Sequence, residues 1–523
     1  MGNLCAPRLR KHARQCCGVS RTLCCGPGRR RTNDLRRKLK DVDEADDIET
    51  VQKSGALNLS YDMLEVAFAP GTQVWFTTQA HKAGGIVTEV CYQHIYGDDF
   101  FRASVEVLVS DGDNIKEDEK TVIVPFYLGH TDASQLPLHR MTPSLLAELT
   151  KRGEKFRQVA LGAHHMQYDG LAFMNWGCCP RMDEIGKDQR GLQTFRAEGR
   201  VMVDAAGFAR FNGNYGDDDG HMAHRRRWLG DTGEIDNGAG KPSLAQIPDE
   251  DLWRTWPTVK GFSFFAKRWG EFFVEALEPM KYRIEAVQSL VMDGDRKKMV
   301  LAMVKHAHSS FSDVVEGKGG GCIFLLHGPP GVGKTLTAEA TSEVLRKPLY
   351  SLTVGELGSS VESMEKRLRD TLELAELWDA ILLIDECDIF LERRDSANVQ
   401  RNAMTGIFLR LLEYHRGVLF MTSNRIDSFD PALYSRITVS LHYPSLDFAA
   451  RVQVWQNMLS AAGLNASKFD VETLAKEPAN GRQIKNAVRF AQVVAQSEEA
   501  AVVTTEHCCL ASRMAREFNP ADA

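Results

Sequence analysis

Residues 322–335 read CIFLLHGPPGVGKT, an apolar run followed by a glycine-rich turn and the start of a helix-like segment. The glycines allow backbone N–H groups to turn inward around phosphate oxygens, and the start of the following helix adds positive charge. This spacing, in its strand–loop–helix context, predicts a phosphate-binding loop for a nucleoside triphosphate. We expect Lys334 to contact the β- and γ-phosphates and Thr335 to bind Mg²⁺. The predicted loop consists of Gly328, Pro329, Pro330, Gly331, Val332, Gly333, Lys334 and Thr335.

An acidic pair ends the next apolar run. Residues 381–384 are Ile-Leu-Leu-Ile, which is typical of a buried parallel strand, and Asp385 and Glu386 follow. Because open α/β sheets bind ligands at the carboxyl ends of their strands, we expect Asp385 to hold Mg²⁺ and Glu386 to polarise an attacking water. A third apolar strand, 417–423, ends at Asn424. Its amide can position the same water, while a turn-forming asparagine is the other interpretation.

Two arginines lie further along the chain. Arg436 ends the segment Asp-Pro-Ala-Leu-Tyr-Ser-Arg, and Arg482 stands in Asn-Gly-Arg-Gln-Ile-Lys-Asn, which opens a helix-like stretch. An arginine can supply positive charge where negative charge must be stabilised on a transferring phosphoryl group. The alternative interpretation of Arg436 is a surface salt bridge. Arg425 is a second candidate for supplying this positive charge.

In this order the motifs resemble those of the AAA+ ATPases, over roughly residues 259–520. The phosphate loop matches Walker A, residues 381–386 match Walker B, and Asn424 falls at sensor 1. The resemblance implies that Arg436 is an arginine finger acting on a neighbouring subunit's ATP, an interaction worth about 10³–10⁵ in rate. It also implies that Arg482, at sensor 2, contacts the γ-phosphate of its own subunit. ATP and Mg²⁺ are the expected cofactors.

The expected fold is an α/β P-loop NTPase core with a five-stranded parallel sheet and a C-terminal helical lid, preceded by an α+β N-terminal domain. The N-terminal domain resembles the one that precedes a single AAA+ module in a group of eukaryotic ATPases, through residues 152–156 and 199–204. An aromatic stretch at 256–275 is expected to pack as a collar against the core or a neighbour. The predicted strands are 322–327, 349–354, 381–385, 417–423 and 439–443. The predicted division is 1–52 tail, 53–211 N-terminal domain, 212–255 linker, 256–445 ATPase core with its aromatic lead-in, and 446–523 lid.

Composition narrows the class of protein. The 523 residues carry a formal net charge of −6 and are 43% hydrophobic, which is ordinary for a globular protein and gives no nucleic-acid signature. No apolar run approaches the length of a membrane span, and no apolar signal-peptide core follows the start. Several cysteines lie within apolar runs, which suits reduced thiols and a cytoplasmic location.

We expect an ATP-hydrolysing protein that remodels or disassembles protein complexes as a ring, typically a hexamer by the resemblance. The alternative is a nucleotide-gated oligomeric scaffold with slow turnover. A nucleic-acid motor is a third reading, but no nucleic-acid partner is expected. The segment 354–362, where threading members of the family carry an aromatic pore-loop residue, has none. Limited disassembly therefore fits better than processive threading, and the sequence does not identify the protein substrate.

The first forty residues are rich in Arg and Lys and contain only Asp34 as an acid. Gly2 is placed for myristoylation once Met1 is removed, although Ala6 stands where that motif has Ser or Thr. Cys5 is close enough to be palmitoylated. Stable membrane binding needs a second signal, which either palmitate or the basic run at 29–38 could provide, each basic residue adding roughly 1 kcal/mol near anionic lipid. The rivals are an unmodified basic tail and a small zinc site built from Cys16, Cys17, Cys24 and Cys25.

A Gly2→Ala substitution tests the predicted anchor. Without an acylated glycine, the protein is expected to move from the membrane pellet to the supernatant in a fractionation experiment, because stable membrane binding takes two signals and the variant lacks one of them. A Cys5→Ser variant separates the two acyl chains. Pelleting of Gly2→Ala to the same extent as wild type would remove the anchor.

Overall fold

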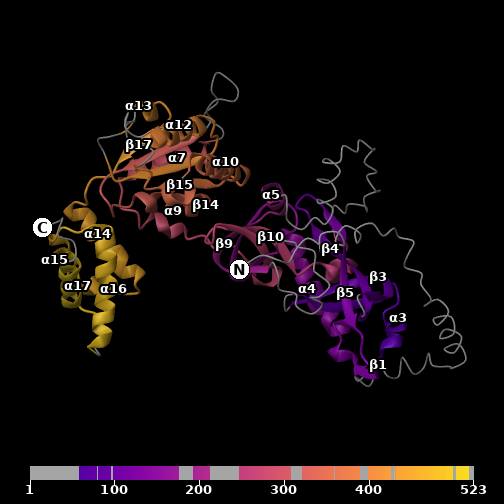
Figure 1. The fold of residues 1–523 in the computed structure, drawn as a ribbon. Coiled ribbons are helices and arrows are strands. Elements are labelled where there is room, and N and C mark those ends of the chain that lie inside the picture. Colours follow the sequence, from indigo (N-terminus) through magenta and orange to yellow (C-terminus); the bar gives the residue numbers. More distant parts are fainter. Residues whose placement is uncertain are drawn as a thin grey trace, which may run out of the picture.

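The computed structural model describes residues 58–78, 81–95, 98–175, 192–212, 247–307, 321–358, 360–388, 399–425, 429, 431–498 and 502–517. The basic tail with Gly2 and Cys5, and the four paired cysteines at 16, 17, 24 and 25, lie outside these residues. Within the described residues, no helix combines the length and the apolar character needed to cross a bilayer. The predicted ATPase core lies between a helical C-terminal unit on one side and the N-terminal strands on the other (Figure 1).

The ATPase core is built on a five-stranded parallel sheet in the order β14-β15-β16-β13-β17. Residues 322–326 of β13 and all of β16 are buried, as expected for strands covered on both faces. This confirms the predicted P-loop core and its strands, which are β13 (Cys322–His327), β14 (Leu349–Thr353), β15 (Ile381–Asp385), β16 (Val418–Ser423) and β17 (Val439–His442). The helices are α7 (Gly294–Lys305), α9 (Lys334–Leu345), α10 (Val361–Leu377), α12 (Val399–Glu413) and α13 (Pro431–Tyr434).

The predicted helical lid is confirmed as a bundle packed around Trp455, which is fully buried. Its longest helix, α16, begins with a reciprocal capping box in which the Asn480 side chain accepts from the Gln483 N–H and the Gln483 side chain accepts from the Asn480 N–H. The lid consists of α14 (Phe448–Ala461), α15 (Val471–Lys476), α16 (Gly481–Ser497) and α17 (Thr505–Glu517).

The N-terminal region contains two antiparallel five-stranded sheets, which bears out the expected α+β class. The first has the order β5-β4-β3-β2-β7, and α4 (Pro143–Val159) follows it in the chain. The buried Arg152 of α4 donates to the carbonyls of Lys82 and Thr255, so the first residue of the 152–156 motif joins distant segments. The strands of this sheet are β2 (Gln73–Thr78), β3 (His81–Ile95), β4 (Asp98–Ser110), β5 (Ile115–Pro125) and β7 (Leu138–Arg140). Separately, β1 (Asn58–Ser60) pairs with β6 (His130–Asp132), and the short helix α3 spans Leu64–Ala67.

The second sheet has the order β11-β10-β9-β8-β12 and is assembled from segments far apart in the sequence. Its strands are β8 (His164–Asn175), β9 (Leu192–Val203), β10 (Thr258–Ser263), β11 (Arg268–Phe273) and β12 (Leu277–Pro279), and α5 (Ala205–Phe211) follows β9. The sequence grouped 256–275 with the ATPase core, whereas these strands pair with β8 and β9. Residues 249–254 of the predicted linker form a 3-10 helix with buried Leu252 and Trp253. The exact domain boundaries stay predictions.

An aromatic cluster joins the second sheet to the ATPase core. Trp378, at the end of α10, lies within 5.5–5.7 Å, centroid to centroid, of Phe262, Phe264 and Trp269. Tyr350, on the edge strand β14, contacts Phe262 and Phe264. The Trp378 indole N–H donates to the buried Asp204 carboxylate at 2.7 Å. The expected collar is thus found against the core, and it packs on the edge of the sheet, where unpaired strand groups need protection.

Replacing Trp378 with Phe is expected to lower the midpoint of urea unfolding, because it leaves a buried Asp204 oxygen without its donor. Such a loss costs roughly 1–3 kcal/mol. Trp455→Phe is the matched control, since the Trp455 indole N–H is buried but has no hydrogen-bond partner among the described residues. Equal decreases in the midpoint of urea unfolding for the two variants would show that only the volume of the ring matters at position 378.

Candidate nucleotide-binding site

The phosphate loop connects β13 to α9 and is fixed at two points. Gly328 has φ +145°, and a Cβ there would lie 2.1 Å from the Tyr443 carbonyl oxygen, which follows β17. Gly331, with φ +76°, accepts a hydrogen bond at its carbonyl from the Gly481 N–H at 2.8 Å, and a Cβ there would lie 2.7 Å from Asn480 Oδ1. Only glycine meets both the conformation and the space. The loop therefore contacts the end of β17 on one side and the first turn of the lid helix α16 on the other.

Lys334, the first residue of α9, is 7% exposed. Its ammonium group donates to the carbonyls of Gly328 and Pro329, both at 2.7 Å, and to Asn424 Oδ1 at 2.9 Å. Burial lowers the pKa of Lys334, and the Asp385 carboxylate opposes that shift. A phosphate group is a stronger acceptor than a carbonyl for an ammonium donor. The contact also brings two predicted site residues, Lys334 and Asn424, together across 90 positions of sequence.

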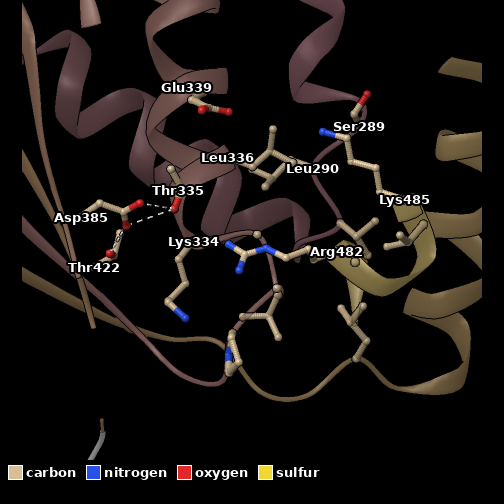
Figure 2. Close-up of a pocket in the computed structure, with 18 of the residues that line it drawn as sticks. Ser289, Leu290, Lys334, Thr335, Leu336, Glu339, Asp385, Thr422, Arg482 and Lys485 are labelled. Carbon is tan, nitrogen blue, oxygen red and sulfur yellow. Dashed lines mark hydrogen bonds between the residues drawn. The ribbon is translucent and has the colours of Figure 1, made fainter. Parts of the chain in front are cut away.

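Thr335 and Asp385, the predicted Mg²⁺ ligands, lie side by side. The Thr335 hydroxyl donates to the two Asp385 carboxylate oxygens at 3.2 and 3.3 Å (Figure 2). A hydroxyl and a carboxylate beside a phosphate site are the hard oxygen ligands that Mg²⁺ takes, with waters and phosphate oxygens completing its shell. These two residues fit the ion, which when bound would neutralise charge on the phosphates.

Thr422, on β16, orients the acidic pair and was missed in the sequence. Its hydroxyl donates to Asp385 Oδ1 and accepts from the Glu386 N–H at 2.9 Å. Glu386 itself has φ +54°, a left-handed conformation that non-glycine residues rarely adopt and that is often found at functional sites. The available signal was a hydroxyl residue near the carboxyl end of a predicted strand, two positions before Asn424.

A cavity of about 330 Å³ gathers most of the predicted residues. Arg482 extends into it from the first turn of α16, opposite the phosphate loop (Figure 2). Glu339 of α9 and Lys485 of α16 also line it, although the sequence analysis did not select them. The apolar wall of the cavity consists of Leu290, Val291, Leu336, Leu446, Val454 and Met458. The predicted site residues that line it are Pro330, Gly331, Val332, Gly333, Lys334, Thr335, Asp385, Glu386, Asn424 and Arg482. A polar end beside an apolar end suits the phosphates and the base of a nucleotide.

Arg436 is not among the described residues that line this cavity. Its guanidinium donates to the carbonyls of Leu409 and Ala432 at 2.9 and 2.8 Å, and to the Glu413 carboxylate at 3.0 Å. These contacts hold Arg436 against the end of α12 in its own chain. Arg425, the second candidate, does not line the cavity either.

Comparison with known proteins is informative for part of the chain. Residues 324–445 match the family model described as the ATPase family associated with various cellular activities (AAA). The chain is 30% identical over 197 residues to a 26S proteasome regulatory subunit 8 homolog from Encephalitozoon cuniculi, covering 35% of this chain and 50% of that protein. It is 32% identical over 195 residues to a proteasome-activating nucleotidase from Archaeoglobus fulgidus, covering 34% and 48%. It is also 31% identical over 166 residues to a cell division control protein 48 homolog B from Arabidopsis thaliana, covering 28% of each. The chain thus spans half or less of the length of these relatives.

Glu386→Gln is expected to leave ATP binding intact and to lower turnover at least about a hundredfold, the scale of general-base catalysis. The substitution removes the charge that is expected to polarise water but keeps the size of the side chain and the backbone hydrogen bond to Thr422. Binding of ATP and release of phosphate should be measured on the purified variant, with the exposed lid residue Glu472→Gln as control. Near-normal turnover would exclude Glu386 from the chemistry.

Proposed function

With residues 324–445 identified as an AAA ATPase domain, we propose that the chain hydrolyses ATP to remodel or disassemble protein complexes. The main support for this proposal is that one cavity is lined by all five side chains expected to act on ATP, which are Lys334, Asp385, Glu386, Asn424 and Arg482. A passive nucleotide-binding protein would need the phosphate loop but not an acid positioned for water activation. The site therefore supports turnover over binding alone.

Each side chain has a defined part in this proposal. Lys334 leaves its loop carbonyls to bind the β- and γ-phosphates, while Thr335 and Asp385 hold Mg²⁺. Glu386 polarises the attacking water and Asn424 orients it, because both line the cavity beside Lys334. Arg482 approaches the γ-phosphate from the lid, so phosphate release would remove this contact of the lid with the nucleotide and leave the hydrogen bond between Gly481 and Gly331.

A ring of subunits, typically a hexamer, is the second part of the proposal. Arg436 lies outside its own chain's cavity, so it can act on ATP only from a neighbouring subunit. To do so it must leave Glu413 and the carbonyl of Leu409. The ion pair between Arg436 and Glu413 also favours the second candidate, a nucleotide-gated scaffold that hydrolyses ATP slowly until Arg436 is released.

The segment after β14 supports limited rearrangement rather than threading. Residues Val354–Leu357 form a 3-10 helix with no aromatic side chain, and Leu357 is buried. Glu356 is held by Lys267 of the β10–β11 turn at 2.5 Å and caps the Thr353 N–H at 2.8 Å. The Lys267 ammonium and the cap keep the pKa of Glu356 low against the effect of burial. A segment fixed in this way is poorly suited to a moving grip on polypeptide.

The remaining proposals concern place and partners. We place the protein in the cytoplasm, attached to membranes where Gly2 and Cys5 are acylated, with a protein complex as substrate and no nucleic-acid partner. The charge of −6 is consistent with the last point.

If Arg436 completes a neighbour's site, specific activity must rise with protein concentration. Mixing Arg436→Ala chains into wild type is then expected to lower the steady-state ATPase rate more than in proportion to their fraction. Arg157→Ala, which removes an exposed ion pair in the N-terminal region, is the control that should only dilute the rate. The same assay is run with and without nucleic acid.

The outcomes separate the candidates. A linear decrease on mixing would mean that each chain works alone. A turnover too slow to measure in wild type, with intact ATP binding, would favour the scaffold. Stimulation by nucleic acid would favour a nucleic-acid motor.

A further inference from the structure

The two ends of α9 contact different parts of the molecule. Its first two residues, Lys334 and Thr335, belong to the nucleotide site. Glu343, near its last turn, is only 13% exposed at the side chain and forms an ion pair with Arg200 of the N-terminal strand β9. At 1.5 Å per residue, the 12-residue helix is about 18 Å long. One rigid helix therefore connects the phosphate site to the N-terminal region.

Glu343 also holds the segment through which the chain passes into the ATPase core. Its second carboxylate oxygen accepts from the Arg283 N–H at 2.8 Å, in the connection between β12 and the core. The neighbouring Tyr282 hydroxyl is hydrogen-bonded to His165 of β8 at 3.0 Å. We call His165, Arg200, Tyr282, Arg283 and Glu343 the crossover cluster. Two strands of the N-terminal sheet, the connection and the end of α9 all meet in it.

The charges in this cluster make the contact obligatory. The C-terminal end of a helix carries partial negative charge, so a carboxylate such as Glu343 is unfavourable there. A largely buried carboxylate is costly without a cationic or hydrogen-bonding partner. Arg200 supplies the positive charge from outside the ATPase core. Any movement of β9 relative to the core therefore pulls on the end of α9 or leaves Glu343 without its charged partner, with only the hydrogen bond from the Arg283 N–H.

We propose that Arg200 and Glu343 are positioning residues through which the N-terminal region sets the nucleotide affinity of the ATPase site. This rests on the proposed ATPase function. Neither residue touches nucleotide; they act by fixing α9, and with it the ammonium of Lys334 and the hydroxyl of Thr335. By thermodynamic reciprocity, nucleotide bound at the first turn of α9 must in turn tighten the contact between β9 and the core.

Two other ion pairs cross the same boundary and provide controls. Arg210 of α5 pairs with Glu373 of α10, and Lys267 pairs with Glu356. Neither Glu373 nor Glu356 belongs to a helix that carries a predicted nucleotide ligand. Loss of these pairs weakens attachment of the N-terminal region without acting on α9.

The experiment compares Arg200→Met, Glu343→Gln, the double variant and Arg210→Met in the full chain. For Arg200→Met, the expected result is an increase of at least about fivefold in both KM for ATP and Kd for a non-hydrolysable ATP analogue, the lower end of typical couplings between sites. kcat should stay within about twofold. Arg210→Met should leave all three values unchanged. The double variant should resemble Glu343→Gln rather than add the two effects.

A second measurement does not depend on activity. Hydrogen exchange of the β9 and β10 amides should slow when the analogue binds wild type or Arg210→Met, but not when it binds Arg200→Met. Arg200→Lys keeps the charge and is used if Arg200→Met fails to fold; it should show a smaller change in the same direction.

The proposal is overturned if KM and Kd of a folded Arg200 variant stay within twofold of wild type, or if Arg210→Met raises them equally. Failure of the proposed function looks different, because wild type itself would then not bind or hydrolyse ATP.

Discussion

The hydrogen bond between the Trp378 indole and the Asp204 carboxylate is the contact around which the two halves of the molecule are organised. The indole N–H is enclosed by aromatic rings and needs an acceptor, since a buried donor without one is costly. Asp204 supplies it with one oxygen, and with the other it caps α5 by accepting from the Gly207 N–H. Its own N–H donates to the Lys260 carbonyl of β10. One residue thus links the end of α10 and the start of α5 through its side chain, and strand β10 through its backbone.

This arrangement makes the N-terminal region part of the ATPase rather than a separate attachment. Phe262 and Met202, both N-terminal, belong to the same buried cluster as Leu325 and Leu382 of the ATPase sheet. The loop after β14 and the end of α9 both contact N-terminal strands through ion pairs. On the opposite side, the phosphate loop is hydrogen-bonded to the first turn of the lid helix. The nucleotide site therefore lies between two contacts, one to the lid and one, through α9, to the N-terminal sheet.

Charged side chains gather at two places, the nucleotide cavity and the boundary with the N-terminal region. Within the cavity, Lys334 and Arg482 are cationic residues beside the phosphate loop, while Asp385 and Glu386 stand at the end of β15. At the boundary with the N-terminal region, Glu343, Glu356 and Glu373 of the core each form an ion pair with an N-terminal cation. Arg436 belongs to neither group, and its guanidinium pairs with Glu413 at the end of α12. If Arg436 is the proposed arginine finger, its release requires the loss of its contacts with Leu409 and Glu413 at the end of α12.

By itself the sequence determined the five core strands, the lid and the main residues of the nucleotide cavity. Its local patterns suffice because a buried parallel strand is a continuous apolar run, and because the phosphate loop is a matter of backbone conformation over eight residues. Only the tertiary structure decided the rest. Strands β10–β12 read locally as a lead-in to the core, yet they pair with strands earlier in the chain, since strand pairing depends on register with distant segments. Thr422 lies 37 positions from Asp385, and Arg200 lies 143 positions from Glu343. No periodicity connects such pairs, because a single buried carboxylate can be compensated from any element that the fold brings beside it.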